Sequence, residues 1–338
     1  MNTAAIPTPA DQTLPTGENT FKVIVFPVAL LGIFWTCQQI AEVIDARGDD
    51  GFWMAVKWSA LLLMGVLSSV LLIAMAVLAH DAVHKVLFRN CFANELLGGL
   101  MSAFGLIPFY ANRQFHLTHH SYAHQPGKDP ENAMHQHNFW FAMTIGSLIG
   151  LGLQFKILLS NLFARLFDKR YLGRTVKDLL LLLVVTDLYF FILPATGIEV
   201  MYSFVPMMAT LPVVFGFRTI SDHYGLPAIN RGLQKTDVLE PDLEQWHKDN
   251  KSMQQEVTGW VVLTNSFLEW LWSNVNYHEV HHKYPYLSYK HLKVTFHATR
   301  EQVPYVVVNG YTRSLLNLMK RDYYSQPEDV RPFLNNLP

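Results

Sequence analysis

Residues 52–79 read FWMAVKWSALLLMGVLSSVLLIAMAVLA and hold one charged residue, Lys57, in 28 positions. As a helix with a rise of about 1.5 Å per residue this stretch reaches about 42 Å, whereas the hydrocarbon core of a bilayer is about 30 Å thick. It therefore predicts a membrane-spanning helix that projects beyond the membrane at one end. The residue that follows is His80.

Three further apolar stretches, at residues 21–41, 178–195 and 199–217, predict additional spans. The whole chain is 50% apolar and 16% charged, against about 25% charged in an average soluble domain. Two more apolar stretches, 93–111 and 138–160, are interrupted by charged residues, proline or glycine, so they would either span or lie at the membrane interface. The sequence predicts an all-α integral membrane protein with about four transmembrane helices.

The distribution of charge predicts how this protein is oriented. The loop at 42–51 is acidic, whereas residues 161–177 are rich in Lys and Arg, so the positive-inside rule places the loop outside and both termini in the cytosol. Residues 1–20 are predicted to be a disordered tail, and 21–338 a single domain with a histidine-rich cytosolic cap. With 26 basic and 27 acidic residues the chain has no sign of a nucleic-acid binder.

Eight of the fifteen histidines fall into three clusters, and all lie at predicted cytosolic helix ends. Helical spacing of i, i+3 and i+4 puts the members of each cluster on one face. The clusters are His80 and His84; His116, His119 and His120; and His278, His281 and His282. His223 follows the last predicted span, returns to the same side of the membrane, and is a ninth candidate ligand.

This number of imidazoles exceeds what one tetrahedral zinc can bind, and it suits two first-row ions of higher coordination. Neutral imidazole favours iron, copper, nickel or zinc over magnesium or calcium. A pair of irons with room for dioxygen is the simplest interpretation of this set of histidines. Asp81, Glu279 and Asp129 lie near the clusters and are candidates to accept the second ring N–H of ligating histidines.

The remaining histidines have no metal-like spacing. His124 is predicted to form a hydrogen bond, and the others are predicted to be surface or cap residues: His135, His137, His247, His291 and His297. The two cysteines, Cys37 and Cys91, predict neither a disulfide framework nor a cysteine metal site.

The order HxxxH, HxxHH, HxxHH, with similar intervals, resembles the membrane fatty acid desaturase superfamily from about His80 to Leu292. Three short segments add to the resemblance: GKDP at 127–130, RTISDH at 218–223 and NYHEVHHKYP at 276–285. Related sequences often have Glu in place of Asp222 and Asn in place of His124, so the surroundings of the ligands would differ here.

The resemblance implies a diiron centre that activates dioxygen and removes hydrogen from an unactivated C–H bond. Electrons would come from ferredoxin or a cytochrome with its reductase, since no haem-binding HPGG segment or cysteine cluster occurs. The implied iron ligands are His80, His84, His116, His119, His120, His223, His278, His281 and His282, with Asp81, Asp222 and Glu279 around them.

Members of this superfamily carry out several reactions: they desaturate acyl chains, hydroxylate or ketolate carotenoids, or convert free fatty acids to terminal alkenes. Acyl desaturation is the expected reaction, with the other outcomes as alternatives. An apolar chain would enter from the bilayer. Arg113, Lys128 or Arg218 would hold an anionic head group or act as ordinary interfacial cations.

Two other classes of function remain as rivals. The residues from His278 to His282 also satisfy HExxH, the zinc protease motif in which Glu279 would be the general base. A metal transporter would place polar ligands near the middle of its spans, but only Asp187 interrupts a predicted span.

Overall fold

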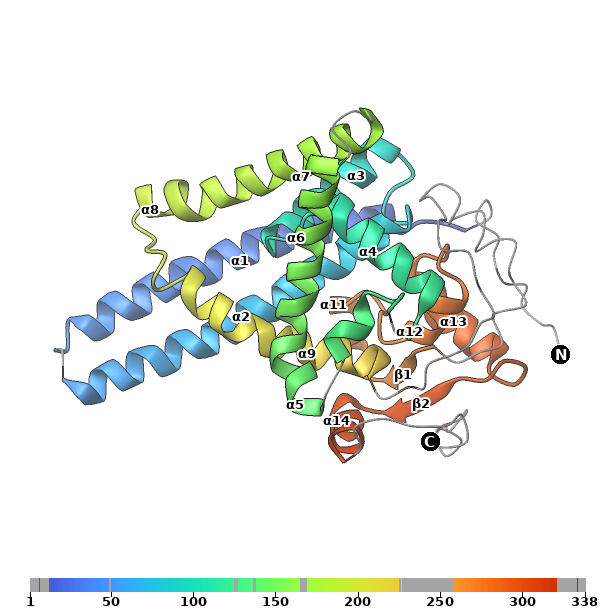
Figure 1. Ribbon diagram of the computed structural model, residues 1–338. Helices are drawn as coiled ribbons and strands as arrows, with labels where there is room; N and C mark the ends of the chain where they lie inside the picture. Colours follow the sequence, from blue (N-terminus) through green and yellow to red (C-terminus); the bar gives the residue numbers. More distant parts are fainter. Residues whose placement is uncertain are drawn as a thin grey trace.

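The computed structural model describes residues 6, 12–48, 50–124, 127–135, 138–164, 169–224, 226, 258–320 and 333. Helices predominate among them, which confirms the predicted all-α class (Figure 1). The helices are α1 (Thr16–Asp45), α2 (Gly51–Val83), α3 (Cys91–Phe104), α4 (Phe109–Tyr122), η1 (Glu131–His135), α5 (Phe139–Phe141), η2 (Ala142–Gly146), α6 (Ser147–Ala164), α7 (Lys169–Asp187), η3 (Leu188–Ile192), α8 (Leu193–Ala195), α9 (Phe204–His223), α11 (Ser266–Leu271), α12 (His278–Lys283), α13 (Tyr289–Thr299) and α14 (Tyr311–Met319).

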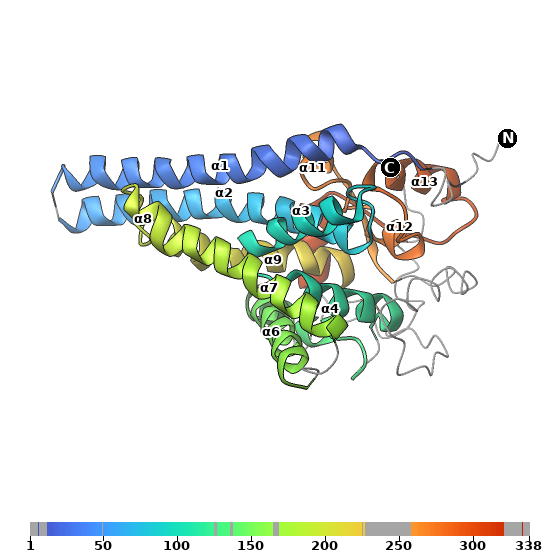
Figure 2. The same ribbon diagram turned by 90° about the horizontal axis from the view of Figure 1, so that it is seen from above.

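The long helices α1 and α2 form an antiparallel hairpin that extends away from the rest of the chain in both views (Figures 1 and 2). Asp50 caps the N-terminus of α2, because its carboxylate accepts a hydrogen bond from the backbone N–H of Trp53 at 2.9 Å. The helix continues to Val83, beyond the predicted end at residue 79. His80 therefore lies in its last turn, at the end opposite the acidic loop.

Helix α9 packs closely along α2. Gly65 makes this possible, because a Cβ at this position would lie 2.4 Å from the carbonyl oxygen of Pro206. One turn later the hydroxyl of Ser69 forms hydrogen bonds with the Thr210 hydroxyl at 2.9 Å and the Met207 carbonyl oxygen at 3.2 Å. α9 begins at Phe204, later than the predicted 199, since Pro206 favours the first turn of a helix.

Four helical segments are long and apolar enough to cross a membrane: α1, α2, residues 139–163 and α9. Three of them coincide with predicted spans. The segment 178–195 is not among the four, so this span remains a prediction. In Figure 1 it runs above α1 as α7, η3 and α8, and the rings of Phe34 in α1 and Tyr189 in η3 lie 5.9 Å apart. Helix α6 lies below α7 in Figure 2, away from α1 and α2, and packs against α4 and α9. Helices α3 and α4 meet at 94°, as expected of an interfacial or re-entrant pair.

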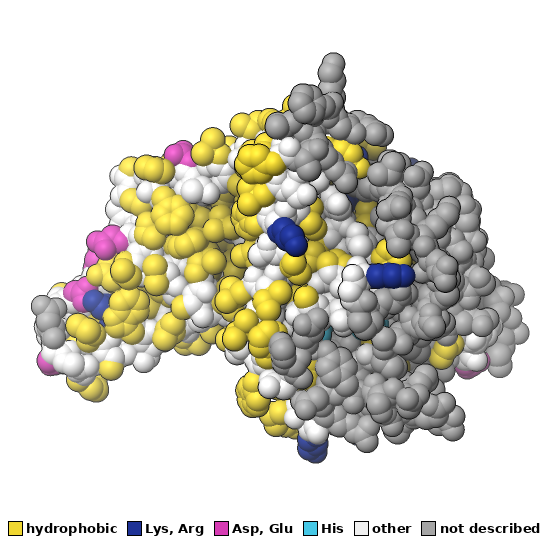
Figure 3. Space-filling view, viewed as in Figure 1, with side chains coloured by type: hydrophobic (Ala, Val, Ile, Leu, Met, Phe, Trp, Pro, Cys, Tyr) yellow, Lys and Arg dark blue, Asp and Glu magenta, His cyan; other side chains and the backbone are white. Residues whose placement is uncertain are grey.

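The exposed surface of the long helices is apolar. Large side chains point outward along α1, α2 and the α7–α8 run, including Ile24, Val28, Leu63, Leu67, Leu183 and Phe191. Figure 3 shows these hydrophobic side chains covering the extended part of the molecule, with acidic side chains near its tip. Such a surface fits a lipid environment, and the chain is a membrane protein.

The N-terminal prediction needs a correction. α1 begins at Thr16 rather than at residue 21, and its first turn is tied to the cap. The amide of Asn19 donates to the Leu87 carbonyl oxygen at 2.7 Å, and the Gln12 side chain accepts from the Ser288 N–H at 2.7 Å. Polar side chains in this segment are therefore buried in protein. Residues 1–5 and 7–11 of the predicted tail lie outside the described residues.

The C-terminal part forms the cap over the inner ends of α2 and α9. Its two short strands, β1 (Trp260–Leu263) and β2 (Val306–Asn309), pair in parallel, and Trp260 is opposite Val306. Helix α12 packs against β1, and this contact places the third histidine cluster over the end of α9.

Candidate metal centre

All nine candidate histidines converge at the junction of the long helices and the cap. α2 supplies His80, with His84 directly after its end, and α9 ends on His223. The short helices α4 and α12 supply the other six. Their ring nitrogens form two groups.

The five-histidine group consists of His80, His84, His116, His120 and His281, and its candidate ligand nitrogens all lie within 4.8 Å of one another. The Nε2 of His116 is 3.0 Å from that of His84 and 2.9 Å from that of His120. The Nε2 of His281 is 3.1 Å from that of His120.

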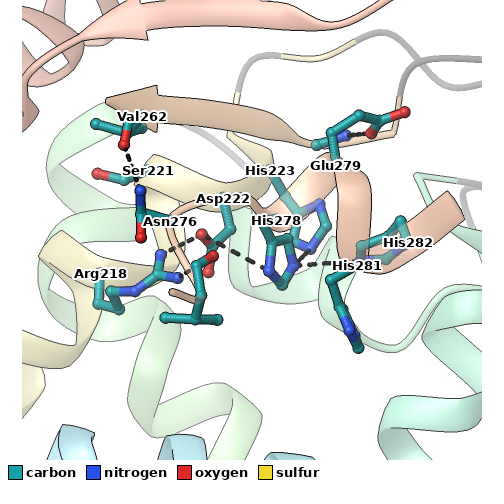
Figure 4. Close-up of polar contacts among 12 residues, drawn as sticks. Arg218, Ser221, Asp222, His223, Val262, Asn276, His278, Glu279, His281 and His282 are labelled. Atoms are coloured by element: carbon teal, nitrogen blue, oxygen red, sulfur yellow. Dashed lines mark hydrogen bonds and ion pairs between the residues drawn. The ribbon is translucent and has the colours of Figure 1, made fainter. Parts of the chain in front are cut away.

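The four-histidine group consists of His119, His223, His282 and His278. The first three satisfy the same 4.8 Å limit. The Nε2 of His119 lies 3.1 Å from that of His223 and 3.3 Å from that of His282. The Nε2 of His278 is 2.8 Å from that of His223 and 3.2 Å from that of His282 (Figure 4). Together with the contacts of His119, these distances close a ring of four nitrogens.

These spacings fit metal ligands. Two imidazole nitrogens at right angles around an ion, each bonded at about 2.1 Å, lie about 3.0 Å apart. His80 adds a second observation: both of its ring nitrogens are buried, with no hydrogen-bond partner among the described residues. A buried imidazole without a partner is costly. An ion in the five-histidine group would satisfy it.

The spacing within each HxxHH cluster divides its members between the two groups. His116 and His120, one full turn apart, belong to the five-histidine group, whereas His119 belongs to the other. In α12 the division is reversed. His281 joins the five-histidine group, while His278 and His282 join the four-histidine group. Residues i and i+4 differ by about 40° around a helix, but i+3 lies about 60° to the other side.

Two imidazoles of α12, those of His278 and His282, are held in the neutral form that binds metal. Burial, followed by the charges of neighbouring histidines, lowers the pKa of His278 and His282 well below the usual range. Their ring nitrogens therefore keep lone pairs at neutral pH.

Hydrogen bonds on the outer side of the four-histidine group fix the orientation of two rings. The Nδ1 of His119 lies 3.0 Å from a carboxylate oxygen of Asp129. The Nδ1 of His223 donates to the Thr258 carbonyl oxygen at 2.8 Å. In both rings Nδ1 carries the proton and Nε2 faces the group. Although burial raises the pKa of Asp129, His119 and then His124 lower it overall, so this carboxyl is ionised.

Glu279 has a different role from the one expected of a carboxylate beside the ligands. One of its oxygens accepts hydrogen bonds from Thr258, from the backbone N–H at 2.7 Å and the hydroxyl at 3.0 Å, and also from the Gly259 N–H. The other oxygen is 2.7 Å from the ammonium of Lys283. Figure 4 shows Glu279 directed away from His278 and toward β1. It supports His223 indirectly, through Thr258.

Two other predicted carboxylates lie near their histidines but beyond hydrogen-bond distance. An oxygen of Asp81 is 3.7 Å from the Nδ1 of His80, and an oxygen of Asp222 is 3.9 Å from the Nδ1 of His278. Asp222 is paired with the guanidinium of Arg218 one turn earlier in α9.

The structure brings further residues to the centre. His124 forms the predicted hydrogen bond, with Nε2 2.7 Å from the Thr258 carbonyl oxygen. His135 was predicted to be a surface or cap residue, and it does not lie at the surface. This side chain is buried, and its ring lies 6.5 Å from that of His223. The short helix η1 folds inward because Met134 packs onto the glycines of α6 and η2.

Glu131 was not predicted as a site residue. One of its oxygens is 3.6 Å from the Nδ1 of His116 and the other is 3.8 Å from the Nε2 of His119, so it lies between the two groups. Burial raises the pKa of Glu131 to about 7. Its position after Asp129 was the one available signal in the sequence.

A cavity of about 190 Å³ leads to the histidines from between α2, α3, α4, α6 and α9. His80, His116, His223 and His278 form part of its wall. Most of the remaining wall is apolar, with contributions from α2, α3, α6 and α9. The arrangement can therefore hold an apolar chain with one of its carbons beside the two histidine groups.

The family model described as fatty acid desaturase matches residues 52–312, which include all nine histidines and most of the described cap. No curated protein matches the chain.

Proposed function

Since the chain belongs to the fatty acid desaturase family, we propose that it is an oxygen-dependent diiron oxidoreductase that introduces a double bond into a fatty acyl chain. The observation that carries the proposal is the position of two histidine groups, each with nitrogens about 3 Å apart, on the wall of one apolar cavity.

Each histidine group would hold one iron. The five-histidine group offers His80, His84, His116, His120 and His281, and the four-histidine group offers His119, His223, His278 and His282. Iron is favoured by the neutral nitrogen ligands and by the family. When bound, the two irons would supply the activation of dioxygen.

The expected reaction consumes one dioxygen. Reduction of O₂ to two waters takes four electrons and four protons. The substrate supplies two of each as two C–H bonds are replaced by one C=C bond, and the remaining two electrons and two protons come from a donor and from solvent. The donor would be a separate ferredoxin or cytochrome with its reductase.

The protein's own side chains position these components. Asp129 and the Thr258 carbonyl hold two ligand rings, and the apolar walls of α2 and α9 exclude water from the reacting carbon. A substrate from the bilayer would reach the cavity without entering water. The acidic α1–α2 loop lies far from the histidines, which supports a cytosolic location for the centre and both termini (Figure 1).

The arrangement of Glu279 argues against the zinc protease alternative. A general base must approach a water on the metal, but both oxygens of Glu279 are engaged by Thr258, Gly259 and Lys283. The nine histidines would also exceed the needs of one zinc ion.

The proposal is tested by metal analysis and by dioxygen uptake of the purified protein with a reductase and a ferredoxin. About two irons per chain and reductant-dependent uptake are expected. Lipid profiling of cells that express the protein, beside cells that express His281→Ala, should reveal new double bonds only with the native protein. A protein that holds zinc alone and consumes no dioxygen would refute the proposal.

A further inference from the structure

The cavity beside the histidines is lined mainly by apolar side chains, with a smaller number of polar ones. α2 and α9 contribute apolar side chains: Leu72, Ile73, Val77, Met208, Leu211 and Phe215. Two charged residues of the wall, Arg218 and Asp222, are paired with each other. The amides of Asn112 in α4 and Gln154 in α6 also line the cavity, and they too require partners, because burial of polar groups costs free energy unless they find them.

The two amides are bonded to each other but not fully satisfied. The Nε2 of Gln154 donates to the Oδ1 of Asn112 at 3.0 Å. The remaining oxygen of Gln154, Oε1, is buried with no hydrogen-bond partner among the described residues. The side chain of Gln154 is only 8% exposed. An unpaired buried amide oxygen costs about 1–3 kcal/mol, which a ligand that donates a hydrogen bond would recover.

A second amide pair between the same two helices provides a comparison. The Nδ2 of Asn161 donates to the Oε1 of Gln114 at 3.1 Å, also from α6 to α4. Neither of these residues lines the cavity. Amide pairs therefore link α4 and α6 without a ligand, and the feature that distinguishes the cavity pair is the unpaired Oε1 of Gln154.

The position of the cavity pair limits what it can bind. Asn112 precedes His116 by one turn of α4, which is about 6 Å along the helix axis. A substrate that reacts at the middle of its chain would present only CH₂ groups here, and these cannot pair with an amide. A substrate whose polar end lies beside the histidines would satisfy Gln154.

We propose that Asn112 and Gln154 form a polar subsite that binds the carboxyl or hydroxyl head of an unesterified fatty substrate. The tail lies along the apolar wall of α2 and α9, and the oxidised carbon is therefore close to the head. The oxidation itself rests on the proposed function, whereas binding of the head group at Asn112 and Gln154 does not depend on it. If both amides turn by 180°, Asn112 donates to Gln154 and the NH₂ of Gln154 is the free group, so the pair can receive either a donor or an acceptor.

The test measures binding without turnover. Radiolabelled dodecanoic acid, 1-dodecanol and dodecane are titrated into the iron-loaded protein with neither dioxygen nor reductant. Gln154→Met, which keeps the shape of the side chain, should weaken binding of the acid, the alcohol or both by about tenfold, and leave dodecane unchanged. Asn161→Leu, the matched control, should leave all three unchanged. The ligand that responds identifies the head group.

The products give a second measurement, which still decides if Gln154→Met does not fold. With the native protein, mass spectrometry should place the oxidised carbon within about five carbons of the head, because one helical turn of about 6 Å equals about five carbons of an extended chain. Equal loss of all three ligands, no loss of any, or oxidation farther from the head would overturn the subsite. Failure of the proposed function would instead appear as absent dioxygen uptake with selective binding retained.

Discussion

His120 and His282 stack face to face, with ring centroids 4.1 Å apart and planes 8° from parallel, although they belong to different histidine groups. The two groups are thus in direct contact. Neighbouring ligands of this kind couple the two proposed ions, so loss of one ligand will be felt at both positions.

Removal of one ligand should therefore cost more than one iron. We expect His119→Ala or His281→Ala to lower the iron content from about two per chain to below one and to abolish activity, while the protein still inserts into the membrane. Mass spectrometric metal analysis of the purified protein tests this. His297→Ala, on the exposed face of α13, is the control and should keep its iron. Full iron and turnover in both ligand variants would refute the ligand assignment.

Asp129→Asn removes the charge that faces the Nδ1 of His119 while keeping the size of the side chain. Loss of such an outer hydrogen bond typically lowers metal affinity by about 10–100-fold. Competition with a chelator should detect this decrease. Asp187→Asn, on an exposed position of α7, should have no effect. Equal affinities in the two variants would show that Asp129 does not support the ligand.

Glu279→Gln would remove the negative charge that faces the buried ammonium of Lys283. Breaking a buried ion pair costs about 3–5 kcal/mol, so the thermal midpoint of the variant should fall sharply. The exposed Glu301→Gln should unfold like the native protein. If Glu279 were instead the general base of a protease, the Glu279→Gln variant would remain stable and would lose peptidase activity.

The stability of the metal-free protein should decrease in acid. Burial, followed by the charge of His124, lowers the pKa of His135 to about 3, whereas in the unfolded chain it is about 6.5. Below about pH 6.5 the unfolded chain binds a proton that the folded chain excludes, so unfolding becomes more favourable as the pH falls. The buried His278 acts in the same direction. Scanning fluorimetry at pH 7 and pH 5 should give a lower midpoint at pH 5, and an unchanged midpoint would contradict this prediction.

Gly65→Ala should destabilise the protein by forcing α2 and α9 apart, because the added Cβ would lie 2.4 Å from the Pro206 carbonyl oxygen. Gly32→Ala in α1 meets no atom within 4 Å and provides the control. There the exchange should be neutral or slightly stabilising, since alanine favours helix. The difference between their thermal midpoints measures the contact, and identical midpoints would mean that the two helices do not pack as closely as described.

The sequence was sufficient to predict features that depend on a single helix. Helical spacing predicted that His116, His119 and His120 lie toward one side of α4, and the length of the apolar stretch 52–79 predicted the long helix in whose last turn His80 lies. Contacts between distant segments were not predictable in this way. The bond from His223 to the Thr258 carbonyl joins residues 35 positions apart. In the sequence Gln154 resembles a polar residue of a surface helix. Only the packing of α6 against α4 and α9 places it on the cavity wall.

The division of each HxxHH cluster between the two groups has a consequence for how the centre would be assembled. α4 gives two ligands to one group and one to the other, and α12 does the opposite. Substitution of the histidines of either helix would therefore remove ligands from both proposed ion positions. Occupation of the first position would also order both helices for the second. Iron uptake should therefore be cooperative, with a sigmoidal loading curve.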